Sequence, residues 1–186
     1  TMMLWSQNMS VVHVSTHCSL REACDRAKKS RVLECIHLAH DAMKRLGLGR
    51  PHVAVAGLNP HSGEHGLFGR EEIEEIIPAV EEARAEGLNV DGPVPPDTVF
   101  LKAYNGIYDI VVAMYHDQGH IPMKMMAFDT GVNVTLGLPI IRTSVDHGTA
   151  FDIAGKGIAK EDSMFSAIDL GIRFAKGICL SSSDNK

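Results

Sequence analysis

Three short apolar segments of this 186-residue chain each run directly into a polar loop that carries a histidine. The segments span residues 11–15, 52–58 and 108–115, and the histidines that follow them are His17, His61 and His116. Helical patterns separate the segments, and strands that alternate with helices predict an α/β fold with a largely parallel sheet. Adjacent parallel strands present their carboxyl ends on one edge, where ligands collect. We therefore expect the three histidines to lie on the same side of the sheet.

The rest of the chain continues this alternation. Further strands are expected at residues 89–94, 132–136 and 140–143, and helices at residues 20–46, 70–86, 97–104 and 163–176. Asp97 is a suitable N-cap for the helix that follows it. Residues 116–120 indicate a loop, and residues 181–186 a frayed tail. Because Thr1 is not an initiator and residues 4–14 already resemble folded interior, we expect the chain to be a piece of a longer protein.

Composition excludes several classes of protein. Hydrophobic residues make up 45% and charged residues 22%, as in ordinary globular domains. The 18 basic and 23 acidic residues give a net charge of −5, which argues against nucleic-acid or anionic-membrane partners. The longest apolar stretches are about half of what a membrane span needs. Four cysteines without CxxC spacing indicate reduced thiols in a cytoplasmic protein.

Histidine is the commonest transition-metal ligand, and neutral imidazoles suit zinc and similar ions. The three histidines that follow strands are 44 and 55 residues apart, too far for a local chelate, so a shared site depends on topology. Three unrelated loop histidines are the alternative. Two pairs have the i, i+4 spacing of a helical chelate, but glycines and Pro60 argue against helix there; they are His61 with His65 and His116 with His120. His13 alternates with apolar neighbours and reads as a satisfied core or interface residue.

Polar side chains near the predicted strand ends suggest an anion site. Lys124 and Arg142 can bind a phosphate or carboxylate if their side chains converge. Asn133 lies between them in the sequence. Asp117 directly follows His116 and is placed to orient an imidazole, although an aspartate in a turn more often bonds nearby backbone. The glycine-rich residues 147–157 support a tight turn with backbone amides free for an anion.

Four motifs together closely resemble the 4-hydroxythreonine-4-phosphate dehydrogenase family over nearly the whole chain. They are STH (15–17), GLNPHSGEHGLFGREE (57–72), YHDQGHIPMK (115–124) and GVNVTLGLPIIRTSVDHGTAFDIAGKG (131–157). Within the last motif, residues 147–157 (HGTAFDIAGKG) also resemble the adenosine-binding loop of isocitrate and isopropylmalate dehydrogenases. The resemblance implies their α/β fold, of which this chain corresponds to about the carboxyl-terminal half. It also implies NAD or NADP, a divalent metal (Zn, Mg, Co or Mn) and a homodimer with its active site between subunits.

Site residues follow from the resemblance position by position. The family's metal-binding histidines match His17, His61 and His116, and its substrate-binding residues match Lys124, Asn133 and Arg142. Catalytic or supporting roles fall on Lys124, Asp97 and Asp117. The cofactor-binding positions are His147, Gly148, Thr149, Ala150, Asp152 and Ala154. Residues 1–150 are then a metal-binding, substrate-binding and dimer-forming domain, and residues 151–186 a segment that returns to a first domain outside the chain.

The implied reaction is NAD(P)-linked oxidation and decarboxylation of 4-phosphohydroxy-L-threonine, a step in pyridoxal 5'-phosphate biosynthesis. Two alternatives stay open. The segments HDQGHIP and AFDTGVN, which contain His120 and Asp129, resemble the sister branch that acts on D-threonate or D-erythronate 4-phosphate more than they resemble the enzyme of pyridoxal 5'-phosphate biosynthesis. The second alternative is that the chain is not part of an enzyme but a non-catalytic module that binds metal or forms a dimer. A fragment with half a cofactor cleft is expected to expose an apolar face and to bind NAD weakly.

Overall fold

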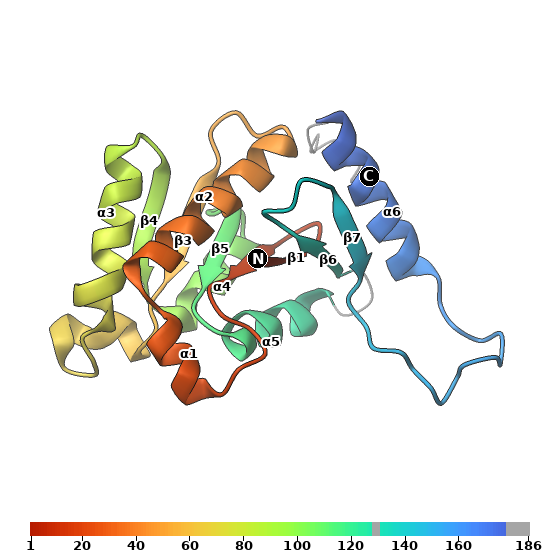
Figure 1. The fold of residues 1–186 in the computed structure, drawn as a ribbon, viewed down its shortest axis with the longest axis horizontal. Coiled ribbons are helices and arrows are strands. Elements are labelled where there is room, and N and C mark those ends of the chain that lie inside the picture. Colours follow the sequence, from red (N-terminus) through yellow and green to blue (C-terminus); the bar gives the residue numbers. More distant parts are fainter. Residues whose placement is uncertain (128–130, 178–186) are drawn as a thin grey trace.

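A seven-stranded sheet forms the centre of the structure, a computed structural model that describes residues 1–127 and 131–177 (Figure 1). Its strands are β1 (Met2–Trp5), β2 (Ser10–His13), β3 (His52–Ala56), β4 (Asn89–Val94), β5 (Ile110–Ala113), β6 (Val132–Thr135) and β7 (Arg142–Val145). In space they follow the order β4-β3-β5-β2-β1-β6-β7. Asp129, Cys179 and the tail at residues 181–186 lie outside the described residues.

Five of the seven strands run in one direction. Strands β4, β3, β5 and β2 are parallel neighbours, whereas β1, β6 and β7 join by antiparallel pairing. Because β6 is antiparallel to β1, and β1 is antiparallel to β2, β6 points the same way as the parallel group. The α/β fold with a largely parallel sheet is confirmed. Strands β2, β3 and β5 are buried along almost their whole length, which explains why the sequences of β3 and β5 are almost entirely apolar.

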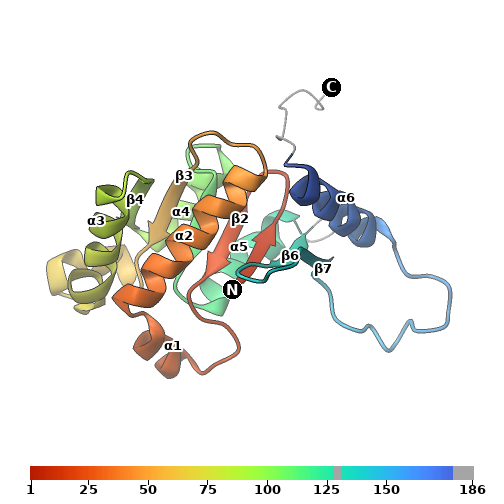
Figure 2. The same ribbon diagram turned by 45° about the horizontal axis from the view of Figure 1, so that its top comes forward.

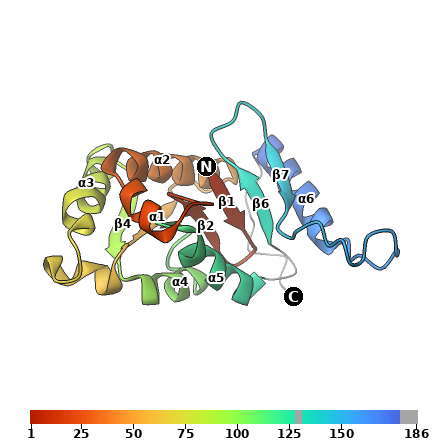
Figure 3. The same cartoon turned by 60° about the horizontal axis from the view of Figure 1, so that its bottom comes forward.

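Helices cover both faces of the sheet (Figures 2 and 3). One face carries α1 (Leu20–Arg26), α2 (Lys29–Arg45), α3 (Ile77–Ala85) and α6 (Asp162–Lys176), and the other carries α4 (Pro96–Tyr104) and α5 (His116–Ala127). Helix α2 buries Val32, Ile36, Ala39 and Met43 at the spacing of one helical face. Two separate apolar cores result, one on each side of the sheet.

Three expected helices differ in detail. The helix predicted over residues 20–46 is two helices, because the chain turns at Ala27 and the carboxylate of Glu75 accepts a hydrogen bond from Lys29 N (2.7 Å) at the start of α2. The helix predicted from residue 70 begins as a wide turn, Glu72–Ile76, and becomes α3 with Pro78 in its first turn. Pro95, not Asp97, is the N-cap of α4, and Asp97 lies in the first turn.

Residues 116–120 form the start of helix α5 instead of the predicted loop. Gly119 and Pro122 both lower helix propensity, which is why the sequence pattern indicated a turn. The glycine has a tertiary role, since a Cβ there would lie 2.4 Å from His13 Nε2 and 2.7 Å from Val11 Cγ1. Its missing side chain lets α5 lie directly on β2, and that packing outweighs the local propensity.

Residues 146–161 leave β7 as a long loop that projects from the body of the structure before α6 begins (Figure 1). Most of this loop is exposed, including Phe151 at 84%. Among the described residues, no helix combines the length and the apolar character that crossing a bilayer requires.

Candidate metal centre and active site

The three strands that lead to the candidate histidines are neighbours in the sheet, in the order β3-β5-β2. His61 follows β3, His116 follows β5 and His17 follows β2. All three strands are parallel, so their carboxyl ends open on one edge. The topology therefore brings the three histidines to the same side of the sheet, as the sequence predicted.

His17 and His116 approach each other closely. Their ring centroids are 5.6 Å apart with the planes 49° from parallel. Both line a cavity of about 540 Å³ at the edge of the sheet, together with Cys18, Tyr115 and Asp117. Metal–nitrogen bonds of about 2 Å place the centroids of two imidazoles on one ion about 5–6 Å apart. The separation of His17 and His116 fits two ligands of a single divalent metal.

Carboxylates hold two of the candidate ligands by the same ring nitrogen. His116 Nδ1 hydrogen bonds to Asp117 Oδ1 at 2.7 Å, and His61 Nδ1 hydrogen bonds to Glu64 Oε1 at 2.8 Å. Such pairs orient an imidazole and leave Nε2 as the ligating atom. The hydrogen bond and the charge of Glu64, with a smaller contribution from Asp97, raise the pKa of His61. Asp97, at the start of α4, is thus electrostatically close to His61.

Two candidate ligands also have an unusual backbone. His17 (φ 47°) and His61 (φ 51°) are both in the left-handed region, which costs a residue with a Cβ about 1–2 kcal/mol. His61 belongs to a left-handed turn, Pro60–Gly66, in which every residue from His61 to His65 has a positive φ. Strained backbone of this kind concentrates at functional sites, where the surrounding structure over-determines it.

The buried carboxylate of Glu72 holds the segment that leads into the left-handed turn by hydrogen bonds. Its side chain is 2% exposed, and its Oε1 accepts hydrogen bonds from Leu58 N (2.8 Å) and Asn59 N (2.7 Å). Its Oε2 accepts one from Asn59 Nδ2 (3.0 Å) and would lie 2.7 Å from a Cβ at Gly63. Three N–H groups satisfy the buried carboxylate without a cation. Glu72 thereby fixes the segment that leads from β3 to His61.

A second pair of histidines lies behind His116. His120, one helical turn later on α5, stacks on His116, and His13 from β2 packs against His120 with centroids 4.6 Å apart. Burial is the largest cause that lowers the pKa of His120, and burial together with the neighbouring His120 lowers the pKa of His13 to about 3. His13 is 1% exposed, and neither ring nitrogen finds a hydrogen-bond partner among the described residues. His13 is therefore a core residue, as the sequence predicted, but its two ring nitrogens are not satisfied within the described residues.

The single chain does not gather all three predicted ligands. Among the residues that the structure describes, no three His, Cys, Asp or Glu side chains converge as a metal site. His17 and His116 form a pair, and His61 stands apart from it on its own turn. A site with ligands from two subunits, as the family resemblance implies, stays a prediction. The stacked rings of His116 and His120 lie in nearly parallel planes, so they do not point two nitrogens at one ion.

The predicted anion-binding residues share one face of the sheet. Val132 and Val134 belong to the core under α2 and α6, so the alternate residue Asn133 faces the side of α5. Thr143 bonds to Ala167 O of α6, so Arg142 also faces the α5 side. Lys124 lies two helical turns after His116 on α5, where its charge lowers the pKa of His120. Their mutual convergence on a substrate is a prediction that no distance here tests.

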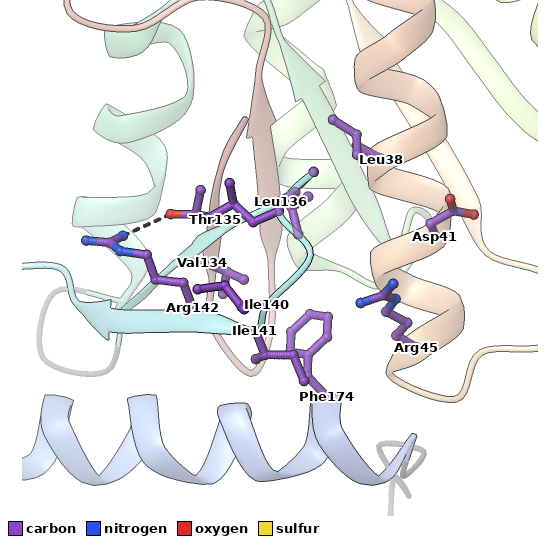
Figure 4. Close-up of a pocket in the computed structure, with 12 residues that line it drawn as sticks. Leu38, Asp41, Arg45, Val134, Thr135, Leu136, Ile140, Ile141, Arg142 and Phe174 are labelled. Atoms are coloured by element: carbon purple, nitrogen blue, oxygen red, sulfur yellow. Dashed lines mark hydrogen bonds between the residues drawn. The ribbon is translucent and has the colours of Figure 1, made fainter.

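Arg142 is only partly engaged by the protein. Its Nη1 donates to Thr135 Oγ1 at 2.9 Å, across the β6–β7 pair (Figure 4). A small cavity of about 110 Å³ lies beside this pair, between α2, the β6–β7 connection and α6. The other guanidinium nitrogens of Arg142 have no hydrogen-bond partner in the described part of the chain, and the residue is exposed. They can therefore reach an anionic ligand.

The predicted cofactor-binding residues lie on the projecting loop after β7. His147, Gly148, Thr149, Ala150, Asp152 and Ala154 are all exposed. Ala150 has a positive φ of 48°, and its carbonyl accepts a hydrogen bond from Ile153 N at 3.1 Å. The loop thus contains the tight turn that the sequence predicted. Its role in binding a cofactor stays a prediction.

Sequence reasoning missed three buried polar residues beside the site. Gln118 and Ser15 hydrogen bond to the backbone where the central strands end, and Glu72 holds the turn before His61. Glu72 belongs to a run of acidic residues, a pattern typical of a solvent-exposed helix face, so its burial could not be predicted. Gln118 offered a weak signal, because it stands between candidate site residues directly after a buried strand.

Comparison with known proteins identifies the family. The model of a family described as "Pyridoxal phosphate biosynthetic protein PdxA" matches residues 1–171. D-threonate 4-phosphate dehydrogenase of Salmonella typhimurium is 56% identical over 174 residues, which cover 94% of this chain and 53% of the relative. 4-hydroxythreonine-4-phosphate dehydrogenase of Beijerinckia indica is 54% identical over 172 residues, covering 92% and 51%. The chain spans about half the length of the curated relatives it matches.

A solved structure shows the same fold. The crystal structure described as 4-hydroxythreonine-4-phosphate dehydrogenase from Klebsiella pneumoniae superposes with a TM-score of 0.85 and is 52% identical, covering 94% of this chain and 53% of that one. The motifs at residues 15–17, 57–72, 115–124 and 131–157 therefore indicated the correct relatives, whose names include both branches. With a family match over residues 1–171 and relatives more than 50% identical, this chain belongs to the PdxA family.

Proposed function

We propose that the chain forms the metal- and substrate-binding half of a dehydrogenase that oxidises the secondary alcohol of a 4-phosphorylated hydroxy acid. The paired imidazoles of His17 and His116 above a cavity of about 540 Å³ carry this proposal. They supply a donor set that suits a divalent metal, at the edge of an α/β sheet where ligands bind. The names of the relatives, all dehydrogenases in the comparisons above, support the reaction class.

D-threonate 4-phosphate is the first candidate substrate. Relatives from Salmonella typhimurium and Pectobacterium atrosepticum, 56% and 55% identical, are named D-threonate 4-phosphate dehydrogenases. 4-Hydroxythreonine 4-phosphate is the second candidate, because a relative from Beijerinckia indica with 54% identity carries that name. The two acids share the 4-phosphate and the secondary alcohol, so the same anion-binding residues serve either one.

A divalent metal bound by His17, His116 and, from a second subunit, His61 would act as a Lewis acid toward the alcohol oxygen. Asp117 and Glu64 would keep the Nδ1 atoms of their histidines occupied, so that Nε2 faces the ion. Arg142 and Asn133 would bind the anionic groups of the substrate. Lys124 has two alternative roles: as an ammonium it would neutralise a substrate anion, and as a neutral amine it would accept the proton that the alcohol loses, while the nicotinamide of NAD or NADP takes the hydride.

A homodimer completes this proposal. Helix α5 exposes Ile121 (57%), Met125 (80%) and Met126 (47%) beyond the stripe of His116, His120 and Lys124. Apolar side chains grouped on a helix beside a binding site are typical of an interface. We place a second copy of the chain against this surface, where its His61 would join His17 and His116.

The test is a dehydrogenase assay with purified protein, metal and NAD or NADP. The 186-residue chain and any longer product of the same reading frame are assayed with D-threonate 4-phosphate, D-erythronate 4-phosphate and 4-hydroxythreonine 4-phosphate. Production of NADH or NADPH with one of these acids, abolished by a chelator and by His116→Ala, is the expected result. Metal binding without turnover by the longest product would instead assign the chain to a non-catalytic metal-binding protein.

A further inference from the structure

A continuous set of hydrogen bonds joins the ends of the three strands that carry the histidines. Ser15 Oγ donates to Met114 O at 2.9 Å, which connects the end of β2 to the end of β5. Met114 N donates to Gln118 Oε1 at 2.7 Å, and Gln118 Nε2 donates to Gly57 O at 2.8 Å. Gly57 directly follows β3, so the set crosses from β2 through β5 to β3.

Gln118 is the central member of this set. Its side chain uses its acceptor on one strand end and a donor on another, and it is only 8% exposed. The same residue lies in the first turn of α5, two positions after His116. Its amide therefore fixes three things at once: the segment before His61, the segment before His116, and the helix turn that holds the His116 ring.

The two backbone groups that bond to Gln118 are buried and depend on its side chain for a hydrogen bond. Met114 is fully buried and Gly57 is buried, so without the Gln118 amide the Met114 N–H and the Gly57 carbonyl would lose their described partner away from water. A buried unpaired backbone group costs about 1–3 kcal/mol. The chain would shift at both strand ends to recover these hydrogen bonds, and His61 and His116 would move with their segments.

We propose that Gln118 is a positioning residue for the metal centre, acting through the strand ends at Gly57 and Met114 to hold the candidate ligands in register. This inference rests on the proposed metal site formed by His17, His61 and His116. It assigns no contact between Gln118 and the metal or the substrate. Residues that orient metal ligands from outside typically change metal affinity by about 10- to 100-fold when they are replaced.

The experiment measures metal binding and stability separately. Purified metal-free protein is titrated with Co²⁺, using calorimetry for the dissociation constant and the visible absorption band for the coordination geometry. Gln118→Met keeps the side-chain volume and removes both hydrogen bonds. We expect its Co²⁺ affinity to fall about 10- to 100-fold and its absorption band to change. Gln118→Glu keeps the bond from Met114 N but replaces the donor to Gly57 O by an acceptor, so its absorption band should change as well.

Ser6→Ala is the matched control. Ser6 is also buried and also makes two side-chain hydrogen bonds to backbone, to Met9 O (2.9 Å) and from Met9 N (3.2 Å). These bonds lie in the turn between β1 and β2, at the opposite end of β2 from His17. Ser6→Ala should lower the melting temperature yet leave Co²⁺ affinity and the absorption band unchanged.

The possible outcomes separate this inference from the proposed function. If the wild-type chain binds no Co²⁺, both fail. If it binds Co²⁺ and Gln118→Met binds equally well with the same band, the positioning role is overturned and the metal site stands. If Gln118→Met does not fold, Gln118→Glu decides, because it removes the hydrogen bond to Gly57 O: a changed absorption band with a several-fold change in Co²⁺ affinity supports the proposal, and an unchanged band and affinity overturn it.

Discussion

The imidazole of His120 lies flat against that of His116, with ring centroids 3.6 Å apart and planes 9° from parallel. His120 Nδ1 is also 3.0 Å from His116 O, the carbonyl one helical turn earlier. The His116 ring is thus held on one face by His120 and at its Nδ1 by Asp117. A ligand fixed from two sides loses little freedom when a metal binds.

Removing the stacked ring should weaken metal binding. His120→Ala takes away the aromatic contact, which is worth about 0.5–1.5 kcal/mol, so we expect Co²⁺ affinity to fall about 2- to 10-fold. His120→Phe keeps a flat ring and should stay within about twofold of wild type. Calorimetric titration of both variants tests this, and equal losses in the two would show that the ring contributes something other than stacking.

His13 should make stability depend on pH. Its folded pKa of about 3 is below the ordinary value of 6.5, so the unfolded chain binds more protons between these two values. The stability is present above pH 6.5 and is lost as the pH falls toward 3. We expect the free energy of unfolding to drop by about 2 kcal/mol between pH 7 and pH 5 from His13 alone.

The variant His13→Leu isolates this effect. It removes a group that titrates and two buried ring nitrogens that have no hydrogen-bond partner in the described part of the chain, so it should be at least as stable as wild type at pH 7. Its loss between pH 7 and pH 5 should be smaller by about 2 kcal/mol. Urea unfolding at both pH values gives the comparison; equal losses in the two proteins would show that the pKa of His13 is the same in the folded and unfolded chain.

Replacing Glu72 should loosen the turn that carries His61. Glu72→Ala leaves Leu58 N and Asn59 N without their acceptor, and we expect the free energy of unfolding to fall by about 2–4 kcal/mol. Glu74→Gln is the control, because Glu74 lies in the same acidic run but its carboxylate, as far as the structure describes the chain, pairs on the surface with Arg70. It should change stability by less than about 1 kcal/mol. Urea unfolding distinguishes the two positions, and similar losses would contradict a special role for Glu72.

Arg142 should matter for the substrate and not for the fold. Arg142→Ala removes an exposed guanidinium held by one hydrogen bond, so stability should change by less than about 1 kcal/mol. If it binds the substrate anion, KM for the phosphorylated acid should rise tenfold or more while the affinity for NAD stays the same. Arg70→Ala, which removes an exposed arginine from the bend before Glu72–Ile76, should leave both constants unchanged. Equal losses of substrate and cofactor binding would refute the assignment.

The sequence predicted the central architecture because the signals there are local. Strands β3 and β5 are almost entirely apolar, β2 is centred on two valines, and the polar loops after these strands mark the edge where ligands bind. The adjacency of these strands in the sheet follows from parallel pairing and brings the loops of His17, His61 and His116 to one edge, although only His17 and His116 approach each other within the described part of the chain.

The features that the sequence did not predict depend on tertiary contacts. Gly119 and Pro122 made residues 116–120 resemble a loop, although they belong to helix α5. The glycine is required there because α5 packs directly on His13, a contact that the sequence does not reveal. The burial of Glu72 and the bridging role of Gln118 depend on backbone groups from distant segments. Likewise, the left-handed turn was expected only as a loop, since its glycines do not reveal that His61, Ser62, Glu64 and His65 also have a positive φ.

The left-handed turn reverses the usual ranking of amino acids for the residues that form it. Glycine ordinarily costs a protein stability, but at the exposed His65, with φ 57°, it would relieve a steric penalty of about 1–2 kcal/mol. His65→Gly should therefore stabilise the fold, whereas a β-branched residue such as valine should be tolerated poorly. In a library randomised across this turn, selection for folding alone would enrich glycine and asparagine, and only a demand for metal binding would preserve the histidine at His61.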